Sequence, residues 1–402
     1  MASKSKSTQI DHIEVVGTYV APVRVLQLGL IDRLFIGSLL LIFGGIVLHA
    51  PLTVFLSTHL PEYALLIKSW KELLLALAGL LLVYVLFKRQ AWGIFKHRLF
   101  YAIIGFAALL VALVPVLFVG VEATLAGILA NLRYLLFFSL VYAALRLYPQ
   151  TKRIFIGTFF AGAAVVMIFA FAQVTFLPHD VLVRLGYGPS TIAPYMTVDN
   201  NMDYVRINST LRGPNPLGAY AAIVLALVAA LWALRFKALS RRWRVGTGLL
   251  AGASLVALLA SYSRAAALGA IGALLLVALA VYGRKISRTI WVGAGLAALV
   301  AFGAFYMLKD TQFVSQVVLH QDPIEGSEVS SNDEHAESLT DGVARMLRQP
   351  LGGGVGSTGS ASLLSDEPLI IENQLLYTAH EAGWVGLVLL VYIQATLLVL
   401  LW

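Results

Sequence analysis

Apolar stretches of about 20 residues recur along this chain, and they limit its fold more than any other feature. A stretch of that length is what an α-helix needs to cross the hydrocarbon core of a bilayer. Of the 402 residues, 59% are hydrophobic and 12% are charged, whereas soluble proteins carry roughly 25% charged residues. The sequence therefore predicts an all-α, polytopic membrane protein.

Ten stretches fit this criterion, and we expect each of them to form a transmembrane helix. They lie near residues 34–57, 67–87, 99–119, 125–146, 153–177, 216–234, 246–261, 264–282, 290–308 and 373–402. Residues 1–308 would thus contain nine helices, residues 309–371 a large outward loop, and residues 372–402 the tenth helix. The chain stops at "TLLVLLW" without a polar tail. We therefore expect further helices to follow it, the alternative being a helix that ends in the cytoplasmic interface.

Lysine and arginine mark every second connection between these helices. They are dense at 88–98, 146–153, 235–244 and 284–288, and the N-terminal segment adds Lys4, Lys6, Arg24 and Arg33. The positive-inside rule places such segments in the cytoplasm, so we expect a cytoplasmic N-terminus and a periplasmic, or extracytoplasmic, loop 309–371. The net charge of +8 then faces anionic membrane lipids, and nothing in its distribution indicates nucleic-acid binding.

Two long segments, 177–213 and 309–371, would lie outside the membrane. Loops longer than about 12–15 residues are usually functional or disordered. The second should contain a short helix, because "SLTDGVARMLRQP" combines an N-terminal Ser, apolar residues at helical spacing and a closing Pro.

Several arginines lie on the predicted outward side. Arg206 and Arg212 precede the sixth helix in "YVRINSTLRGPNPLGAY", and Arg264 lies at the turn between the seventh and eighth helices. Arg133 lies inside an apolar run, where a charge costs about 2.5–3.5 kcal/mol on insertion scales. One interpretation is that each side chain reaches the outer headgroups singly. The other is that their guanidinium groups meet in an outward cavity and bind a phosphate or pyrophosphate through paired hydrogen bonds.

Four blocks around these residues resemble the O-antigen ligase and O-antigen polymerase superfamily. "INSTLRGPNPLGAYAAI" resembles its "GT…NPN…LG" block, and "LLASYSRAAALGAIGALLL" is similar to its "SRGAxLG" helix start. "RQPLGGGVGSTGS" looks like its "P-L-x-G-x-G" turn, and "ENQLLYTAHEAGWVGLVLL" resembles "HNxYLQxxAExGxxGL". The blocks have the order and similar spacing of the superfamily, and they cover residues 206–390.

The resemblance implies glycosyl transfer at the outer face of the bacterial cytoplasmic (inner) membrane. The donor in this superfamily is a glycan on undecaprenyl pyrophosphate. The acceptor is a saccharide in O-antigen and exopolysaccharide polymerases, and the lipid A core in the ligases of lipopolysaccharide biosynthesis. By motif position Arg212 and Arg264 would bind the pyrophosphate, with Arg206 and Arg345 as further candidates.

No cofactor and no metal ion is expected for this reaction. The chain has no cysteine, which excludes thiolate ligands, and no other set of cation ligands is visible in the sequence. Arginines would instead stabilise the negative charge of the leaving group. The alternative function is a transporter or flippase of a lipid-linked sugar, which would carry charged residues along several helices at mid-membrane depth.

The chain departs from the superfamily at the position of a catalytic residue. The ligases place His before Asn in this block, whereas this sequence has Glu372 before Asn373. Glu372 could act as a general base or orient the acceptor, with His380, about two helical turns further on, in support. His320 and His335 are alternatives. The departure favours a polymerase or another exopolysaccharide enzyme over a lipopolysaccharide ligase.

Three further patterns have simpler interpretations. The segment "GVGSTG" matches a dinucleotide-binding pattern, but it lacks the required strand and helix, so we expect tight turns with positive φ. Asn208 begins a glycosylation sequon that we interpret as coincidental. Lys68, Lys71 and Glu72 are candidates for an outer cavity, with Glu72 paired to one of the lysines.

Overall fold

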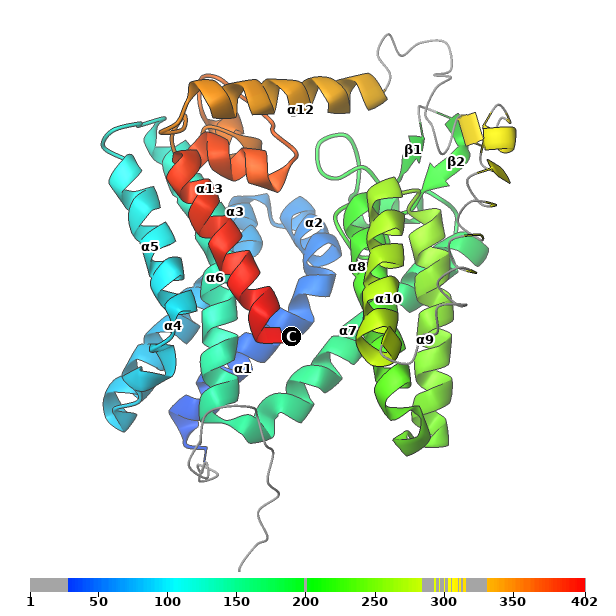
Figure 1. The fold of residues 1–402 in the computed structure, drawn as a ribbon, viewed down its shortest axis with the longest axis horizontal. Coiled ribbons are helices and arrows are strands. Elements are labelled where there is room, and N and C mark those ends of the chain that lie inside the picture. Colours follow the sequence, from blue (N-terminus) through cyan, green and yellow to red (C-terminus); the bar gives the residue numbers. More distant parts are fainter. Residues whose placement is uncertain are drawn as a thin grey trace, which may run out of the picture.

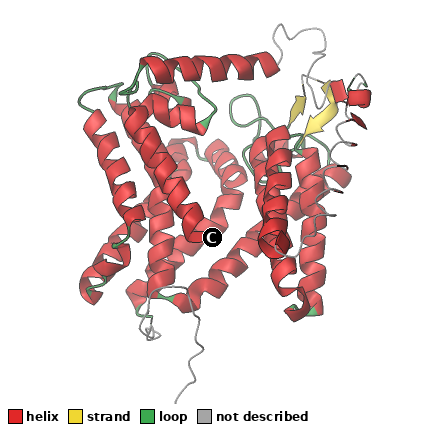
Figure 2. Cartoon of the chain, in the orientation of Figure 1, coloured by secondary structure: helices red, strands yellow, loops and turns green. Residues whose placement is uncertain are grey.

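The computed structural model describes residues 28–198, 201–283 and 331–401, together with a few positions between 293 and 315. Nearly all of this part of the chain is helical (Figure 1, Figure 2). The helices are α1 (Leu30–Gly45), α2 (His49–His59), α3 (Ala64–Lys68), α4 (Trp70–Arg89), α5 (Arg98–Leu113), α6 (Val121–Leu147), α7 (Lys152–Thr175), α8 (Pro214–Arg235), α9 (Arg241–Ala260), α10 (Arg264–Tyr282), α12 (Ser331–Arg348) and α13 (Gln374–Leu401). Two short strands, β1 (Met196–Val198) and β2 (Asn201–Arg206), pair antiparallel.

Eight segments of the described chain are long and apolar enough to cross a membrane, which agrees with the predicted polytopic all-α class. They are Leu30–His59, Trp70–Arg89, Val121–Leu147, Pro149–Thr175, Pro214–Ala238, Arg241–Ala260, Arg264–Tyr282 and Gln374–Leu400. The helix predicted at 99–119 is shorter, because α5 ends at Leu113. Val114 still has a helical conformation, but Pro115 follows it and has no backbone N–H to continue the helical hydrogen bonds. The helix predicted at 290–308 lies largely outside the described residues.

The helices pack into two groups that α7 joins. The buried faces of α1, α4 and α6 share one apolar core, which includes Phe35 and Leu82. A second core lies between α7, α8, α9 and α10 and includes Leu217 and Ala257. Helix α7 contacts both α1 and α9, and Figure 1 shows it running obliquely between the two groups.

The outer faces of these helices remain apolar. On α10, Leu268, Ile271 and Leu275 are between 53% and 71% exposed and lie on one face of the helix. Exposed stripes of this kind suit lipid chains rather than water, since a soluble protein rarely exposes contiguous apolar patches of such size.

The loop segments predicted to face outward gather at one end of the bundle. Helix α12 and the β1–β2 pair both lie at the upper end in Figure 1, whereas the connections from α6 to α7 and from α8 to α9 lie at the lower end. Helix α12 is the helix predicted within the second outward segment. It begins at Ser331 rather than at Ser338, and it ends at Arg348, just before Pro350.

Helix α13 is interrupted at Gly383, and a loop forms hydrogen bonds with the backbone groups that the interruption leaves unpaired. Gly383 has φ of 66°, outside the helical region. The hydrogen bond that Trp384 would make to His380 within a regular helix is replaced by two bonds to the loop. The Trp384 amide donates to the carbonyl of Pro350 (2.9 Å), and the Gly353 amide donates to the carbonyl of His380 (2.5 Å). The kink therefore has a specific cause, the insertion of another backbone into the helical ladder.

Candidate functional site

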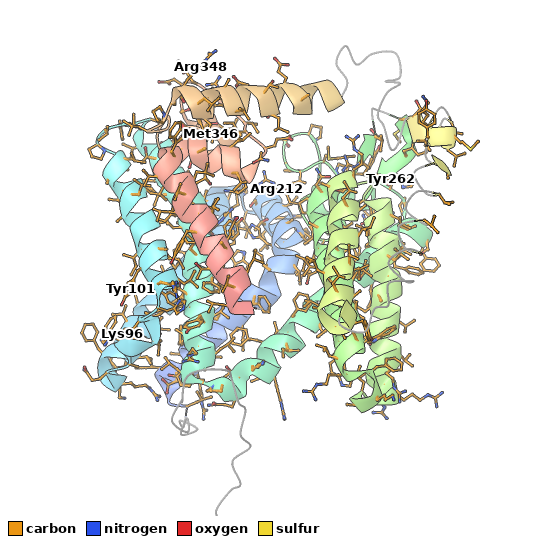
Figure 3. All side chains as sticks on the ribbon, viewed as in Figure 1. Lys96, Tyr101, Arg212, Tyr262, Met346 and Arg348 are labelled. Carbon is orange, nitrogen blue, oxygen red and sulfur yellow. The ribbon has the colours of Figure 1, made fainter. Side chains whose placement is uncertain are left out.

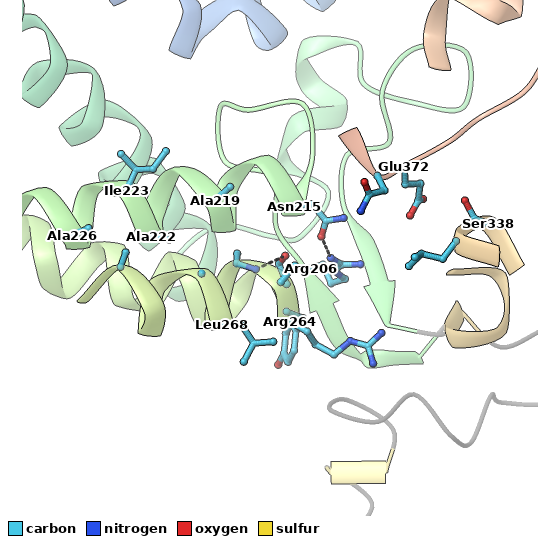
Figure 4. Close-up of a pocket in the computed structure, with 18 of the residues that line it drawn as sticks. Arg206, Asn215, Ala219, Ala222, Ile223, Ala226, Arg264, Leu268, Ser338 and Glu372 are labelled. Carbon is cyan, nitrogen blue, oxygen red and sulfur yellow. Dashed lines mark hydrogen bonds between the residues drawn. The ribbon is translucent and has the colours of Figure 1, made fainter. Parts of the chain in front are cut away.

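A cavity of about 1030 Å³ lies between α8, α10, α12 and the residues that precede α13. Its lining combines polar residues with small and branched apolar ones. The polar residues are Arg206, Asn215, Tyr262, Ser263, Arg264, Ser338, Glu372 and Asn373. Figure 4 shows Arg206, Asn215 and Glu372 at one end of this cavity, with Ile223 and Ala226 of α8 at the other. We call it the first cavity.

Arg206 is held in place at the end of β2. Its Nε donates to the carbonyl of Ser261 (3.0 Å), and its Nη2 donates to Oδ1 of Asn215 (2.6 Å). These bonds connect the hairpin to the turn before α10 and to the first turn of α8. The guanidinium group is therefore preorganised at the rim of the first cavity.

Arg264 occupies the first position of α10, directly after the N-cap. Ser263 caps the helix, with its Oγ accepting from the amide of Ala266 (3.4 Å). A helix N-terminus carries a partial positive charge, so Arg264 adds a full charge to a place that already attracts anions.

Tyr262, which the sequence analysis did not identify, stands next to these arginines. Its φ of 47° is rare for a residue with a side chain. Burial, and then the neighbouring Tyr204, raise the pKa of its phenol. The Tyr262 hydroxyl therefore stays protonated near neutral pH and can donate a hydrogen bond into the cavity.

Glu372 reaches the first cavity because a glycine-rich loop fixes the chain just before it. The hydroxyl of Thr358 accepts from the amide of Ile371 (3.1 Å), and the amide of Gly359 donates to the carbonyl of Leu369 (2.8 Å). Glu372 itself is exposed to the cavity. Its position thus depends on a loop that lies more than ten residues earlier in the sequence.

The glycine-rich loop packs so closely against α6 and the turn that precedes it that side chains would not fit. Gly354 and Gly356 have φ of 101° and 92°, which confirms the predicted turns at positive φ. A Cβ on Gly356 would lie 2.1 Å from the carbonyl oxygen of Ala123, and one on Gly354 would lie 2.2 Å from that of Leu117.

Glu381 fastens this loop to the bundle. Its side chain is fully buried, and its carboxylate accepts from Nδ2 of Asn131 on α6 (2.5 Å) and from the amide of Gly356 (2.9 Å). Because one of these donors is on α6 and the other is in the loop, the buried carboxylate ties the glycine-rich loop to the bundle.

His380 does not line the first cavity, although it was predicted to support Glu372. Helix α13 begins at Gln374, so the helical spacing on which that prediction rested does not extend back to Glu372. His380 is 4% exposed, and its ring packs against Gly353. His320 lies outside the described residues, as does the side chain of His335.

Arg345 and Arg212 also lie apart from Arg206 and Arg264. Arg345 donates to Asp341 on the same helix, α12 (2.6 Å). Arg212 lines a second cavity of about 690 Å³, and Figure 3 shows it between α2 and α8. Arg206, Arg264 and Glu372 are thus brought together, while the other three predicted residues are located elsewhere.

The second cavity is lined by three basic residues besides His49, namely Lys68, Lys71 and Arg212. It is lined by His49, Ala50, Thr53, Val54, Ser57, Thr58, Pro61, Ala64, Lys68, Lys71, Gly186, Ser190, Thr191, Ile192 and Arg212. The Glu72 carboxylate accepts from Lys71 (3.2 Å) and contacts Arg133 at 3.7 Å. The predicted pairing of Glu72 with a lysine is therefore confirmed, and Arg133 has an acidic partner.

Two further predictions concern the glycosylation sequon and possible metal ligands. Asn208, Ser209 and Thr210 of the sequon are at most 7% exposed, and Asn208 donates to the carbonyl of Ala193 (2.7 Å), which makes the sequon inaccessible in the folded protein. Within the described part of the chain, no group of three or more His, Asp or Glu residues is arranged to hold a metal ion.

Comparison with known proteins finds one family. Residues 249–391 match the family model described as O-antigen ligase. The matched segment includes Arg264, Glu372 and the glycine-rich loop, whereas Arg206 and Arg212 precede it. No curated protein and no solved structure matches the chain.

Proposed function

We propose a specific reaction for this chain, starting from the match of residues 249–391 to the family model described as O-antigen ligase. The protein transfers a glycan from undecaprenyl pyrophosphate to a saccharide acceptor, without a metal ion, at the outer face of the bacterial inner membrane. The acceptor hydroxyl and the pyrophosphate both meet the enzyme in the first cavity.

The observation that carries this proposal is the composition of the first cavity. Arg206, Arg264 and Glu372 share one end of it. The remaining lining is apolar and comes from α8 and α10, both of which are long enough to span a membrane. A polar end with two guanidinium groups and an apolar wall fit a pyrophosphate attached to a long isoprenoid chain.

The chemistry follows from these groups. The bond between the anomeric carbon and the pyrophosphate oxygen breaks, and its electron pair remains on the pyrophosphate. Arg206 and Arg264 stabilise that charge as it forms. The acceptor oxygen attacks the opposite face of the anomeric carbon, which inverts its configuration, and the proton of the acceptor hydroxyl passes to Glu372.

Glu372 also bears on the choice between polymerase and ligase. The superfamily's ligases have His at this position of the motif, and this chain has Glu. We therefore place the protein among the polymerases or related exopolysaccharide enzymes. In a deletion strain, loss of long chains with single repeat units retained identifies a polymerase, whereas unattached lipid-linked polymer identifies a ligase.

The test uses glycan chain length in cells that lack the native gene and carry Arg206→Ala, Arg264→Ala or Glu372→Gln. Each variant removes one proposed contact in the first cavity, so we expect short glycans from all three at normal protein levels. Arg348→Ala is the matched control, because Arg348 is an exposed arginine outside both cavities. Wild-type chain length in all three variants would refute the proposal.

A transporter or flippase of a lipid-linked sugar remains the alternative function. The distribution of charged residues distinguishes it from the proposed glycosyltransferase. A transporter requires charges along its path through the membrane. Arg133, which fitted this interpretation best, contacts Glu72 in the first turn of α4, next to the second cavity. Movement of labelled lipid-linked sugar across vesicles by the purified protein, with the glycan unchanged, would favour the alternative.

A further inference from the structure

The second cavity is strongly cationic. Lys68, Lys71 and Arg212 carry positive charges into it, and Glu72 balances only part of this charge because it also contacts Arg133. Lys71 and Arg212 both lie close enough to His49 to interact with it electrostatically. Such a concentration of positive charge beside a membrane attracts oxyanions.

The hydrogen bonds of His49 show where an anion would bind. The indole N–H of Trp70 can only donate, and it donates to Nδ1 of His49 (2.9 Å). The proton of the neutral imidazole is therefore on Nε2, which lies 3.2 Å from Nζ of Lys71. Two hydrogen-bond donors, the Nε2–H of His49 and the ammonium group of Lys71, thus point at each other at the cavity surface. An oxyanion would accept from both and remove this conflict.

A further donor lines the same cavity. The Oγ of Ser57 is shielded from solvent and has no hydrogen-bond partner. By contrast, the hydroxyls of Thr53, Thr58 and Thr191 donate to backbone carbonyls. A buried hydroxyl without a partner costs stability. Ser57 lies eight residues after His49 on α2, about 12 Å along the helix axis, so another polar group of the same ligand, further along the cavity, would supply the missing acceptor.

The start of α8 separates the two cavities. Arg212 lines the second cavity, and Asn215, which binds Arg206, lines the first. Three residues of chain span at most roughly 11 Å. A group bound by Arg212 therefore lies close to one bound by Arg206, yet the two sets of lining residues do not overlap.

We propose that the second cavity binds an oxyanion, a phosphate or a carboxylate, carried by the acceptor glycan. This inference rests on the proposed glycosyl transfer and adds to it that the acceptor is acidic. The donor pyrophosphate occupies the first cavity and the acceptor anion the second, so that the acceptor hydroxyl approaches the donor past the first turn of α8.

Binding of radiolabelled inorganic pyrophosphate to the purified full-length protein tests the proposal, and it does not depend on catalysis. In equilibrium dialysis the wild type should bind two equivalents. The double variant Lys71→Met, Arg212→Gln should lose one equivalent, and the double variant Arg206→Gln, Arg264→Gln should lose the other. Lys68→Met provides a second test that disturbs the fold less, because Lys68 is exposed; we expect weaker binding at one of the two sites. Arg348→Gln is the control and should keep both.

Inorganic phosphate and glucuronate, used as competitors, distinguish the two sources of the anion. The compound that displaces one equivalent at the lower concentration identifies the acidic group. In transfer assays Lys71→Met should raise the KM for the acceptor about 10-fold, as expected for the loss of one charge-assisted hydrogen bond. The KM for the donor should not change.

Each result can be assigned to one of the two proposals. If the wild type binds one equivalent that both double variants abolish, a single pyrophosphate spans both cavities, and the acceptor site is refuted. If it binds one equivalent that only the Arg206→Gln, Arg264→Gln variant abolishes, the acceptor site is again refuted while the donor site stands. A third outcome is that the wild type binds two equivalents of pyrophosphate while every first-cavity variant makes glycans of wild-type length. That result would refute the proposed glycosyl transfer, but both anion-binding sites would stand.

Discussion

Arg264 illustrates at the scale of one residue how position decides chemistry. An arginine in the first turn of a helix is repelled by the helix dipole, and an anion in the first cavity would turn this repulsion into an advantage. The same residue at the C-terminal end of α10 would be stabilising but would not serve such a site.

We predict that Arg264→Lys lowers glycan transfer about 10–100-fold, since lysine keeps the charge but cannot donate the paired hydrogen bonds of a guanidinium group. Initial rates with a purified undecaprenyl-pyrophosphate-linked donor measure the effect. Arg242→Lys is the control, because Arg242 is exposed at the opposite end of the bundle. Full activity of Arg264→Lys would mean that charge alone matters at this position.

Loss of Glu381 should lower the stability of the fold, whereas loss of Glu372 should lower glycan transfer. Glu381 is buried and accepts two hydrogen bonds, whereas Glu372 is exposed to the first cavity. Glu381→Leu would leave the donors on Asn131 and Gly356 unpaired, at a cost of about 1–3 kcal/mol each. We expect a clearly lower midpoint of thermal unfolding for Glu381→Leu in detergent.

Glu372→Leu is the matched comparison for this pair. We expect it to lower the unfolding midpoint less than Glu381→Leu does, because Glu372 is exposed, and to lose glycan transfer. An unchanged midpoint for Glu381→Leu would show that the loop is held by other contacts.

At the scale of elements, the glycine-rich loop and the broken helix α13 form one unit. The loop supplies the hydrogen bonds that α13 lacks at Gly383, and the helix supplies Glu381 to hold the loop. Two blocks that resemble the superfamily are thus in direct contact. Together they fix the chain on both sides of Glu372.

Gly356→Ala should disrupt the contact of the glycine-rich loop with α6 and with Glu381 of α13. The positive φ alone costs about 1–3 kcal/mol for a residue with a side chain, and the added methyl group would overlap the carbonyl of Ala123, a backbone atom that cannot move aside cheaply. We expect loss of both stability and glycan transfer, measured by thermal unfolding and by chain length in cells. Gly188→Ala is the control, because its Cβ would meet open space. Equal behaviour of the two variants would contradict the packing described here.

At the scale of the whole molecule, both cavities should face the periplasm. The absence of native cysteine makes single-cysteine labelling straightforward. Glu367→Cys, in the loop before α13, should react with a membrane-impermeant maleimide in intact spheroplasts. Lys237→Cys, between α8 and α9, should react only after permeabilisation. The reverse labelling pattern would mean that both cavities face the cytoplasm, where a periplasmic donor could not reach them.

Much of the fold was accessible from the sequence because membrane spans are a local property. Runs of apolar residues located the helices, and the ends near Pro115 and Pro350 follow from proline chemistry. The start of α12 was misjudged, since the polar residues from Ser331 onward carry no apolar pattern. The break in α13 could not be predicted, because its cause is a loop that lies about 30 residues earlier in the chain.

The sequence by itself determined that the chain is helical and has membrane-spanning segments, that arginines accompany the segments predicted to face outward, and that Glu372 stands in a recognisable block. Each of these depends on neighbours along the chain. Only the tertiary structure decided which of those charged groups meet. Arg206 and Arg212 are six residues apart, yet they line different cavities, because the chain between them turns at Ser209, which has φ of 52° and is buried. Arg264 and Glu372 are more than 100 residues apart, yet they line the same cavity, because helix packing, not chain distance, sets which side chains share a space.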